Sequence, residues 1–141
     1  MLWICLPVYE EVISNYLQKM NQLLGMQKFN FSKASSKDLP KESGVYVIYD
    51  NRIKSVVYIG RTRNLRRRLL GDHRAGDVKG SQLRKAIGRR FSLKSEAEIT
   101  DYILENCSIQ FMVIKEFEET IRLEHFATAI LAPVLNVRLK Q

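Results

Sequence analysis

The runs GVYVIYD at residues 44–50 and SVVYIG at residues 55–60 decide the fold. Both are rich in β-branched and aromatic residues, which are favoured in strands. Residues 50–52, with the letters DNR, lie between the runs and supply the chemistry of a turn. The two runs therefore predict an antiparallel hairpin.

The chain before the hairpin predicts one helix and a loop. Apolar residues recur at spacings of three and four over residues 8–24, which is typical of one helical stripe. We expect an N-terminal helical extension over residues 1–30 and the main domain over residues 31–141, with residues 30–43 as a loop. The helix either packs on the main domain or forms a homodimer with a second copy, and packing is the simpler role.

The chain after the hairpin alternates between helical and strand patterns. Asn64 is a candidate N-cap, and Ser95 with Glu98 three residues later forms a capping-box pattern. Pro133 ends the last helix. We expect helices over residues 65–70, 81–87, 96–104 and 118–131, and a strand over residues 108–114. This order predicts an α+β domain with a small, mainly antiparallel three-stranded sheet flanked by helices.

The positive charge is concentrated in one segment. The chain carries a net charge of +8, and the segment from Arg61 to Arg90 alone holds eleven Lys and Arg against Asp72 and Asp77, a net of +9. Such a focused field favours a polyanion such as DNA, although a solvated helix face is the alternative. The candidate nucleic-acid-binding residues are Arg61, Arg63, Arg66, Arg67, Arg74, Lys79, Arg84 and Lys85.

Two features indicate a soluble protein of the reducing cytoplasm. The only cysteines, Cys5 and Cys107, allow neither a disulfide framework nor a four-thiolate zinc site within one chain. The apolar start is too short to span a membrane, and Glu10 and Glu11 follow it without any basic residue before it, which is a poor signal peptide.

The tripeptides GVY at residues 44–46 and YIG at residues 58–60 resemble the two motifs of the GIY-YIG nucleases, with Val in place of the first Ile. Either tripeptide alone is weak evidence, because any half-buried strand prefers such residues. Arg68, Glu124 and Asn136 stand at the family spacings, on the helix after the second motif, on the last long helix and after a Pro turn. The resemblance covers about residues 44–136.

The resemblance implies an endonuclease that hydrolyses DNA phosphodiester bonds with one Mg²⁺ or Mn²⁺ ion. In this interpretation Glu124 holds the metal, Tyr46 is the general base, Tyr58 orients the water and Arg68 stabilises the transition state, with Asn136 either part of the site or a support of its turn. A phenol titrates near 10, so Tyr46 needs nearby cations to act as a base.

A histidine departs from the family pattern by one position. Many members carry His four residues after the arginine, whereas Asp72 holds that place here and His73 follows it. One residue turns a side chain by about 100° on an α-helix. We still expect His73 near the scissile phosphate, as a further catalytic residue.

Two other functions compete with the enzyme. The first is a non-catalytic nucleic-acid-binding module with the same fold, and the second is an interaction domain that dimerises through the N-terminal helix. The intact set of Tyr46, Tyr58, Arg68 and Glu124 favours the enzyme over the first, and the concentrated charge disfavours the second.

Overall fold

The structure, a computed structural model, describes residues 5–136, and their side chains from residue 8 onward. One antiparallel sheet has the strand order β1-β4-β2-β3. Its strands are β1 (Phe29–Asn30), β2 (Gly44–Asp50), β3 (Ser55–Thr62) and β4 (Cys107–Val113). The helices are α1 (Cys5–Leu24), the π-helix η2 (Arg67–Arg74), α2 (Gln82–Arg90), α3 (Glu96–Asn106) and α4 (Phe117–Leu131). The predicted α+β architecture is confirmed.

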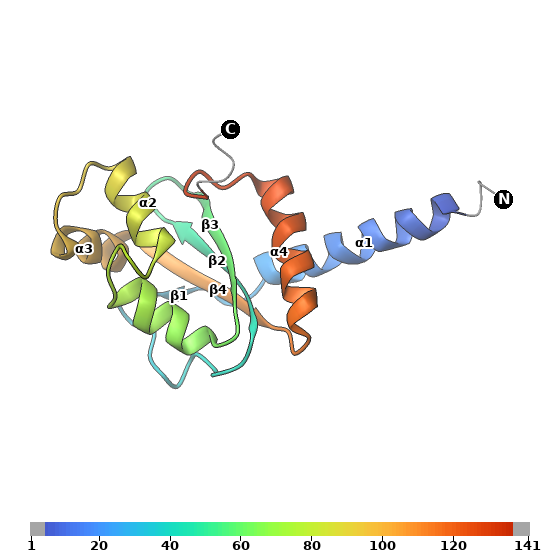
Figure 1. Ribbon diagram of the computed structural model, residues 1–141, viewed down its shortest axis with the longest axis horizontal. Helices are drawn as coiled ribbons and strands as arrows, with labels where there is room; N and C mark the ends of the chain where they lie inside the picture. The colour runs from blue at the N-terminus through green and yellow to red at the C-terminus, as the bar shows by residue number, and fades with distance from the viewer. Residues whose placement is uncertain (1–4, 137–141) are drawn as a thin grey trace.

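Helices cover both faces of the sheet (Figure 1). Alternate residues of β2 point to opposite faces, as strand geometry requires. Tyr46 and Ile48 belong to the core under η2, α2 and α3, whereas Val45 and Val47 belong to the core under α1 and α4. All four side chains are buried, so the central strand is apolar on both faces.

The sheet has four strands, one more than the three predicted, because β1 forms where the chain enters the predicted loop over residues 30–43. Strand β1 pairs antiparallel with β4, with Phe29 opposite Ile109. A two-residue strand is too short to show an alternating pattern in the sequence. Its pairing depends on β4, which lies far along the chain. The three longer strands and the hairpin agree with the prediction.

Helix α1 is packed at one end and exposed at the other. Met20 and Leu23 are buried in the core between the sheet and α4, which confirms the predicted packing of this part. The other end projects from the body (Figure 1), with Val8, Tyr9, Val12, Ile13 and Leu17 exposed. Pairing of this face with a second copy and a domain boundary at residue 30 stay predictions. Across residues 5–136, no helix combines the length and apolarity needed to cross a bilayer.

Local signals fix the helix starts around the site. Asn64 Oδ1 accepts a hydrogen bond from the Arg67 N–H at 3.0 Å, as expected for an N-cap. Ser81 caps α2 by accepting from the Arg84 N–H, and Ser95 with Glu98 forms the predicted capping box of α3. Segment 67–74 is longer than the predicted helix and has π rather than α geometry.

Candidate active site

An open groove of about 1030 Å³ follows the outer edge of β3. Strands β2 and β3, helices η2 and α4 and the turn after Pro133 each contribute side chains to its walls. The predicted site residues that line it are Tyr46, Tyr58, Arg61, Arg63, Arg67, Arg68, Lys79, Glu124 and Asn136. The fold therefore gathers residues from distant parts of the sequence along one edge strand.

The two motif tyrosines lie side by side because their strands are paired. Tyr46 is opposite Gly60 across β2 and β3, and Tyr58 lies two residues from Gly60 on the same face. The two rings are 6.4 Å apart between centroids, with an interplanar angle of 26°. A Cβ on Gly60 would overlap the Tyr46 phenol, so the motif glycine leaves room for the motif tyrosine.

The π-helix brings His73 to the same site. Arg68 and His73 are five residues apart, and a π-helix hydrogen-bonds residues five apart where an α-helix bonds residues four apart. Residues at this spacing therefore stack on one face, which compensates for the one-residue shift. His73 Nε2 lies 2.7 Å from Tyr46 Oη.

The imidazole of His73 is enclosed and neutral. It is 1% exposed, and Nδ1 lies 2.6 Å from Ser81 Oγ. Burial lowers the pKa of His73 to about 3, and the positive charges of Arg68 and Arg84 act in the same direction. At neutral pH the ring is therefore neutral and carries one proton, on either Nδ1 or Nε2.

Burial also disfavours the charged form of Tyr46. Its pKa is raised well above 10, first by burial and then by the neighbouring Tyr58, while Arg68 acts in the opposite direction. The phenol is thus protonated in this environment. A role as a base requires further positive charge or hydrogen-bond donors at its oxygen.

Arg68 is anchored at the groove wall. Its Nη1 lies 3.1 Å from Asp72 Oδ2 and donates to the Gly80 carbonyl oxygen at 3.3 Å. Asp72 thus pairs with the arginine four residues before it. The side chain of Arg68 remains 34% exposed and faces the groove.

Glu124 supplies a carboxylate on the opposite wall. Its Oε2 accepts from Arg61 Nη1 at 2.9 Å, and its side chain is 15% exposed. Within residues 5–136 no three His, Cys, Asp or Glu residues gather as a metal cage. One hard carboxylate oxygen beside open space suits Mg²⁺, which keeps most of its water and also binds substrate phosphates.

Asn136 is held against the backbone of β3. Its Oδ1 accepts from the Ile59 N–H and its Nδ2 donates to the Ile59 carbonyl oxygen, each at 3.0 Å. The Leu135 N–H donates to the Val57 carbonyl oxygen at 2.9 Å. These bonds occupy the free edge of β3 next to Tyr58, so Asn136 holds the strand that carries the second motif.

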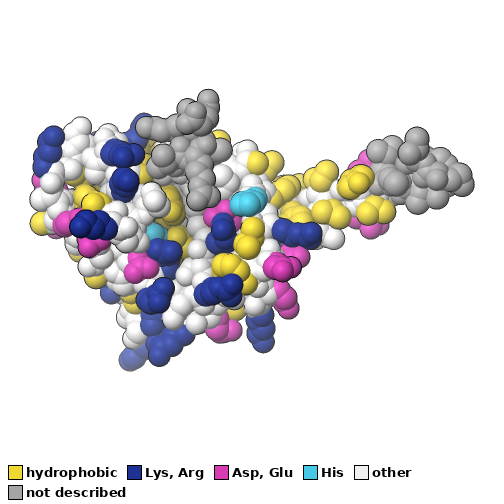
Figure 2. All heavy atoms as spheres, in the orientation of Figure 1, with side chains coloured by type: hydrophobic (Ala, Val, Ile, Leu, Met, Phe, Trp, Pro, Cys, Tyr) yellow, Lys and Arg dark blue, Asp and Glu magenta, His cyan; other side chains and the backbone are white. Residues whose placement is uncertain are grey.

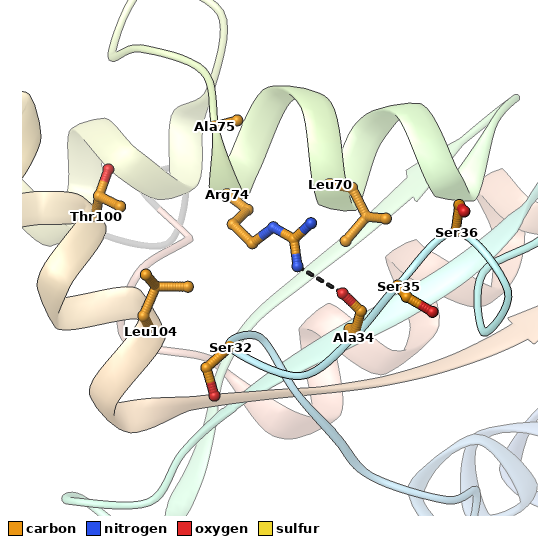
Figure 3. Close-up of a pocket in the computed structure, with 9 residues that line it drawn as sticks. All are labelled: Ser32, Ala34, Ser35, Ser36, Leu70, Arg74, Ala75, Thr100 and Leu104. Atoms are coloured by element: carbon orange, nitrogen blue, oxygen red, sulfur yellow. Dashed lines mark hydrogen bonds between the residues drawn. The ribbon is translucent and has the colours of Figure 1, made fainter.

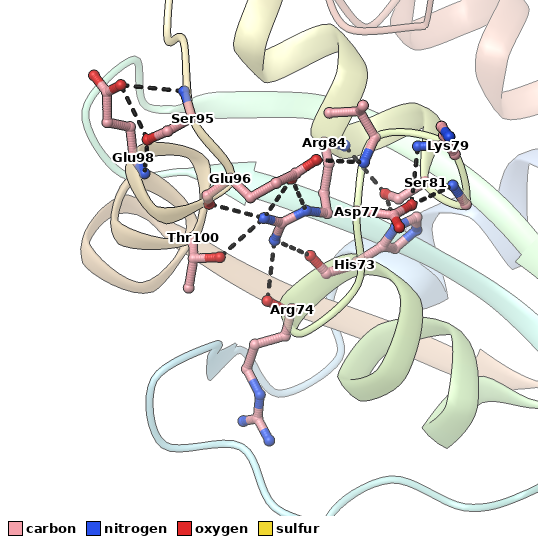
Figure 4. A network of polar contacts seen from close by, with 12 residues as sticks. His73, Arg74, Asp77, Lys79, Ser81, Arg84, Ser95, Glu96, Glu98 and Thr100 are labelled. Carbon is pink, nitrogen blue, oxygen red and sulfur yellow. Dashed lines mark hydrogen bonds and ion pairs between the residues drawn. The ribbon is translucent and has the colours of Figure 1, made fainter.

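One predicted DNA contact is wrong. Arg84 is completely buried, and its guanidinium donates to the carbonyl oxygens of His73, Arg74 and Glu96 and to the side chains of Glu96 and Thr100 (Figure 4). A side chain with all its donors engaged inside the protein cannot reach a phosphate.

Three other predicted DNA contacts lie away from the groove. Arg66 Nε donates to the Leu39 carbonyl oxygen. Arg74 Nη1 donates to the carbonyl oxygens of Phe31 and Ala34, and Figure 3 shows the bond to Ala34. Lys85 is exposed on α2 and is absent from the groove lining. On the face shown in Figure 2, Lys and Arg side chains are scattered rather than gathered in one patch. The density of basic residues in the sequence therefore overstates how many face the groove.

Sequence reasoning did not identify Ser81 as part of the site. It was predicted only as the first residue of a helix over residues 81–87. Its contact with His73 depends on how η2 and α2 are placed in the fold.

The model of the GIY-YIG catalytic domain matches residues 42–125. No curated protein matches the chain. Solved structures of the GIY-YIG N-terminal endonuclease domain of UvrC from Thermotoga maritima are similar. A point mutant of this UvrC domain, bound to its catalytic divalent cation, is 22% identical to this chain, with a TM-score of 0.45. The match covers 71% of this chain and 88% of the UvrC domain chain. The magnesium-bound domain is 19% identical, covering 70% and 86%, with a TM-score of 0.44. Because the family model matches more than half of the residues of this chain, the chain belongs to the GIY-YIG catalytic domain family.

Proposed function

We propose that the chain is an endonuclease that hydrolyses DNA phosphodiester bonds with one divalent metal ion. The observation that carries this proposal is the groove at β3, where Tyr46, Arg68 and Glu124 converge from a strand and two helices. Family membership supports the same chemistry. The similar Thermotoga maritima domain is described with a catalytic divalent cation, magnesium.

Basic side chains on the groove walls would hold the DNA backbone. Arg63, Arg67 and Lys79 are exposed there, and the guanidinium of Arg63 lies 3.9 Å from the ring centroid of Phe117. Such contacts fix the position of a duplex without reading its sequence. We therefore propose DNA as the partner, and these contacts assign no preferred base sequence.

Glu124 would hold the metal, Mg²⁺ or Mn²⁺. A divalent ion there would polarise the scissile phosphate and help neutralise the charge that develops during hydrolysis. Arg61 Nη1 donates a hydrogen bond to Glu124 Oε2, which orients the carboxylate.

The remaining residues would act on the phosphate and on the attacking water. Arg68, at the groove wall, would donate to the phosphate oxygens as negative charge grows on them. Tyr46, after releasing its own proton to water in the groove, would accept the proton of the attacking water, which Tyr58 would orient. His73, whose Nε2 lies against Tyr46 Oη, would hold the phenol oxygen in place. Asn136 would keep β3 in place for these contacts.

The cytoplasm is the compartment that we propose for such a DNA-acting enzyme. Burial raises the pKa of the Cys107 thiol to about 12, and the nearby Asp50 adds to the effect. The thiol thus stays protonated and unreactive, which agrees with a structural role in a reducing compartment.

Cleavage assays on several DNA forms test the proposal. Purified protein is incubated with supercoiled, linear, branched and single-stranded DNA in Mg²⁺, in Mn²⁺ or in EDTA. We expect cutting of at least one form with a metal and none in EDTA. Binding without any cutting, under all of these conditions, would instead support the non-catalytic binding module.

A further inference from the structure

A chain of short hydrogen bonds runs from the first turn of α2 to the base of the groove. Ser81 Oγ lies 2.6 Å from His73 Nδ1, and His73 Nε2 lies 2.7 Å from Tyr46 Oη. All three side chains are 2% exposed or less. Tyr46 lines the open groove, whereas Ser81 and His73 do not, so of the three groups only the Tyr46 hydroxyl can find a further acceptor in groove water. The directions of the other bonds then follow from the proton count.

The proton count begins at Ser81. Its oxygen already accepts the N–H of Arg84 at 3.1 Å, as the N-cap of α2. Its hydroxyl carries a single proton, and among residues 8–136 the other hydrogen-bond partner of this oxygen is His73 Nδ1. A buried hydroxyl proton without an acceptor is unfavourable, so Ser81 donates to Nδ1.

The direction at Tyr46 follows. A neutral imidazole has one protonated nitrogen, and Nδ1 is the acceptor in this arrangement. We propose that Ser81 is a positioning residue that fixes His73 in the tautomer with its proton on Nε2, so that His73 donates a hydrogen bond to Tyr46 Oη. In the opposite tautomer, with the proton on Nδ1, the buried Ser81 hydroxyl proton would have no hydrogen-bond acceptor.

This direction suits a tyrosine that has to lose its proton. A donor at the phenol oxygen stabilises the phenolate, whereas an acceptor there stabilises the phenol. It also turns the Tyr46 proton away from His73 and toward the groove, where water accepts it when the phenolate forms. The catalytic consequence rests on the proposed nuclease function, but the tautomer itself does not.

Arg84 holds both partners in place. Its backbone N–H bonds Ser81, while its guanidinium Nη1 donates to the carbonyl oxygens of His73 at 3.1 Å and Arg74 at 3.0 Å (Figure 4). One buried side chain therefore joins the end of η2 to the start of α2. The distance between Ser81 and His73 is thus fixed by the fold.

Nitrogen-15 NMR of the imidazoles tests the tautomer without any DNA. The chain has two histidines, and His125, whose side chain is 64% exposed, serves as the internal reference. We expect the wild-type His73 signals to show protonated Nε2 and unprotonated Nδ1. Ser81→Thr keeps the hydroxyl and should keep this pattern, whereas Ser81→Ala should move His73 toward protonated Nδ1. Protonated Nδ1 in the wild type, or the same tautomer in Ser81→Ala, would overturn the proposal.

Ser95→Ala is the matched control. Ser95 caps α3 as Ser81 caps α2, but its bonds go to Glu98. Loss of a cap alone should therefore leave the His73 signals unchanged. If Ser81→Ala does not fold, the wild-type and Ser81→Thr spectra still test the proposal, because both should show protonated Nε2 in His73.

A kinetic comparison tests the consequence for cleavage. At saturating DNA, Ser81→Ala should cut about tenfold more slowly than the wild type, as expected for one misdirected hydrogen bond in proton transfer, with unchanged DNA affinity. Ser81→Thr should restore the rate. A shifted tautomer with a wild-type rate would show that Ser81 does not act through Tyr46.

Discussion

Gly60 lies directly against the phenol of Tyr46. The two residues are paired across β2 and β3, and a Cβ added to Gly60 would overlap Oη and Cζ of the tyrosine. The two motifs are therefore one steric unit, in which the glycine of one makes room for the tyrosine of the other.

Replacing this glycine should impair cleavage more than folding. Gly60→Ala should displace the Tyr46 ring, destabilise the protein by about 1–3 kcal/mol and abolish most nicking. Gly71→Ala is the control, because its Cβ would meet only Arg67 Cγ at 3.7 Å, an ordinary contact. Denaturant titration and plasmid nicking measure the two effects. Wild-type nicking by Gly60→Ala would contradict the account.

Basic residues on the groove wall should govern the salt dependence of DNA binding. Arg67 is exposed and lines the groove, whereas Lys85 is exposed on α2 outside it. Arg67→Ala should reduce the slope of log affinity against log salt by about one, while Lys85→Ala should leave it nearly unchanged. Gel-shift titrations at several salt concentrations measure this slope. Equal effects of the two variants would mean that DNA does not follow the groove.

The buried guanidinium of Arg84 should contribute to stability rather than to DNA binding. Arg84→Ala removes the donors of several buried acceptors and should destabilise the protein by about 3 kcal/mol or more. Arg89→Ala, on the exposed end of α2, should change stability by about 0.5 kcal/mol at most. Urea denaturation compares the two. A stable Arg84→Ala with weakened DNA binding would reverse this assignment.

His73 should make the protein sensitive to acid. Its pKa is lowered from 6.5 to about 3 by burial, so below pH 6.5 the unfolded chain binds a proton that the folded protein does not. The free energy of unfolding should therefore fall as pH falls through this window, by up to about 1.4 kcal/mol per pH unit from this group.

A histidine variant isolates this contribution from that of the carboxylates. His73→Gln should show a flatter dependence of unfolding free energy on pH between 6 and 4 than the wild type. The exposed His125 provides the control, and His125→Gln should retain the wild-type slope. Urea titrations across the pH series give the slopes, and parallel curves for all three proteins would rule out a buried neutral His73.

Short-range patterns predicted the elements that local chemistry determines. The hairpin follows from residues 44–60, and the caps at Asn64 and Ser95 follow from side chains that bond their own helix. The positions of Tyr46, Arg68 and Glu124 around one groove agree with the family spacing. For the hairpin and the caps the deciding contacts lie close in sequence, whereas the three groove residues come from distant elements and were expected from the family resemblance alone.

Features that depend on distant contacts were not predictable in the same way. The two-residue strand β1 exists through its pairing with β4. No local pattern distinguishes the buried Arg84 from the exposed Lys85 beside it, because burial depends on how η2, α2 and α3 pack. The π geometry that brings His73 to Tyr46 is likewise a property of the packed helix.

Glu124→Gln tests the central claim, that the groove is a metal-dependent nuclease site. Glutamine keeps the size of the side chain and an acceptor for Arg61, but it removes the charge that would hold Mg²⁺. Glu118→Gln, exposed in the first turn of the same helix, is the matched control. The measurement is Mg²⁺-dependent plasmid nicking beside a gel-shift titration for all three proteins. We predict that Glu124→Gln nicks about a hundredfold more slowly or worse, with DNA affinity equal or slightly tighter, while Glu118→Gln matches the wild type. Nicking by Glu124→Gln at the wild-type rate would contradict the account.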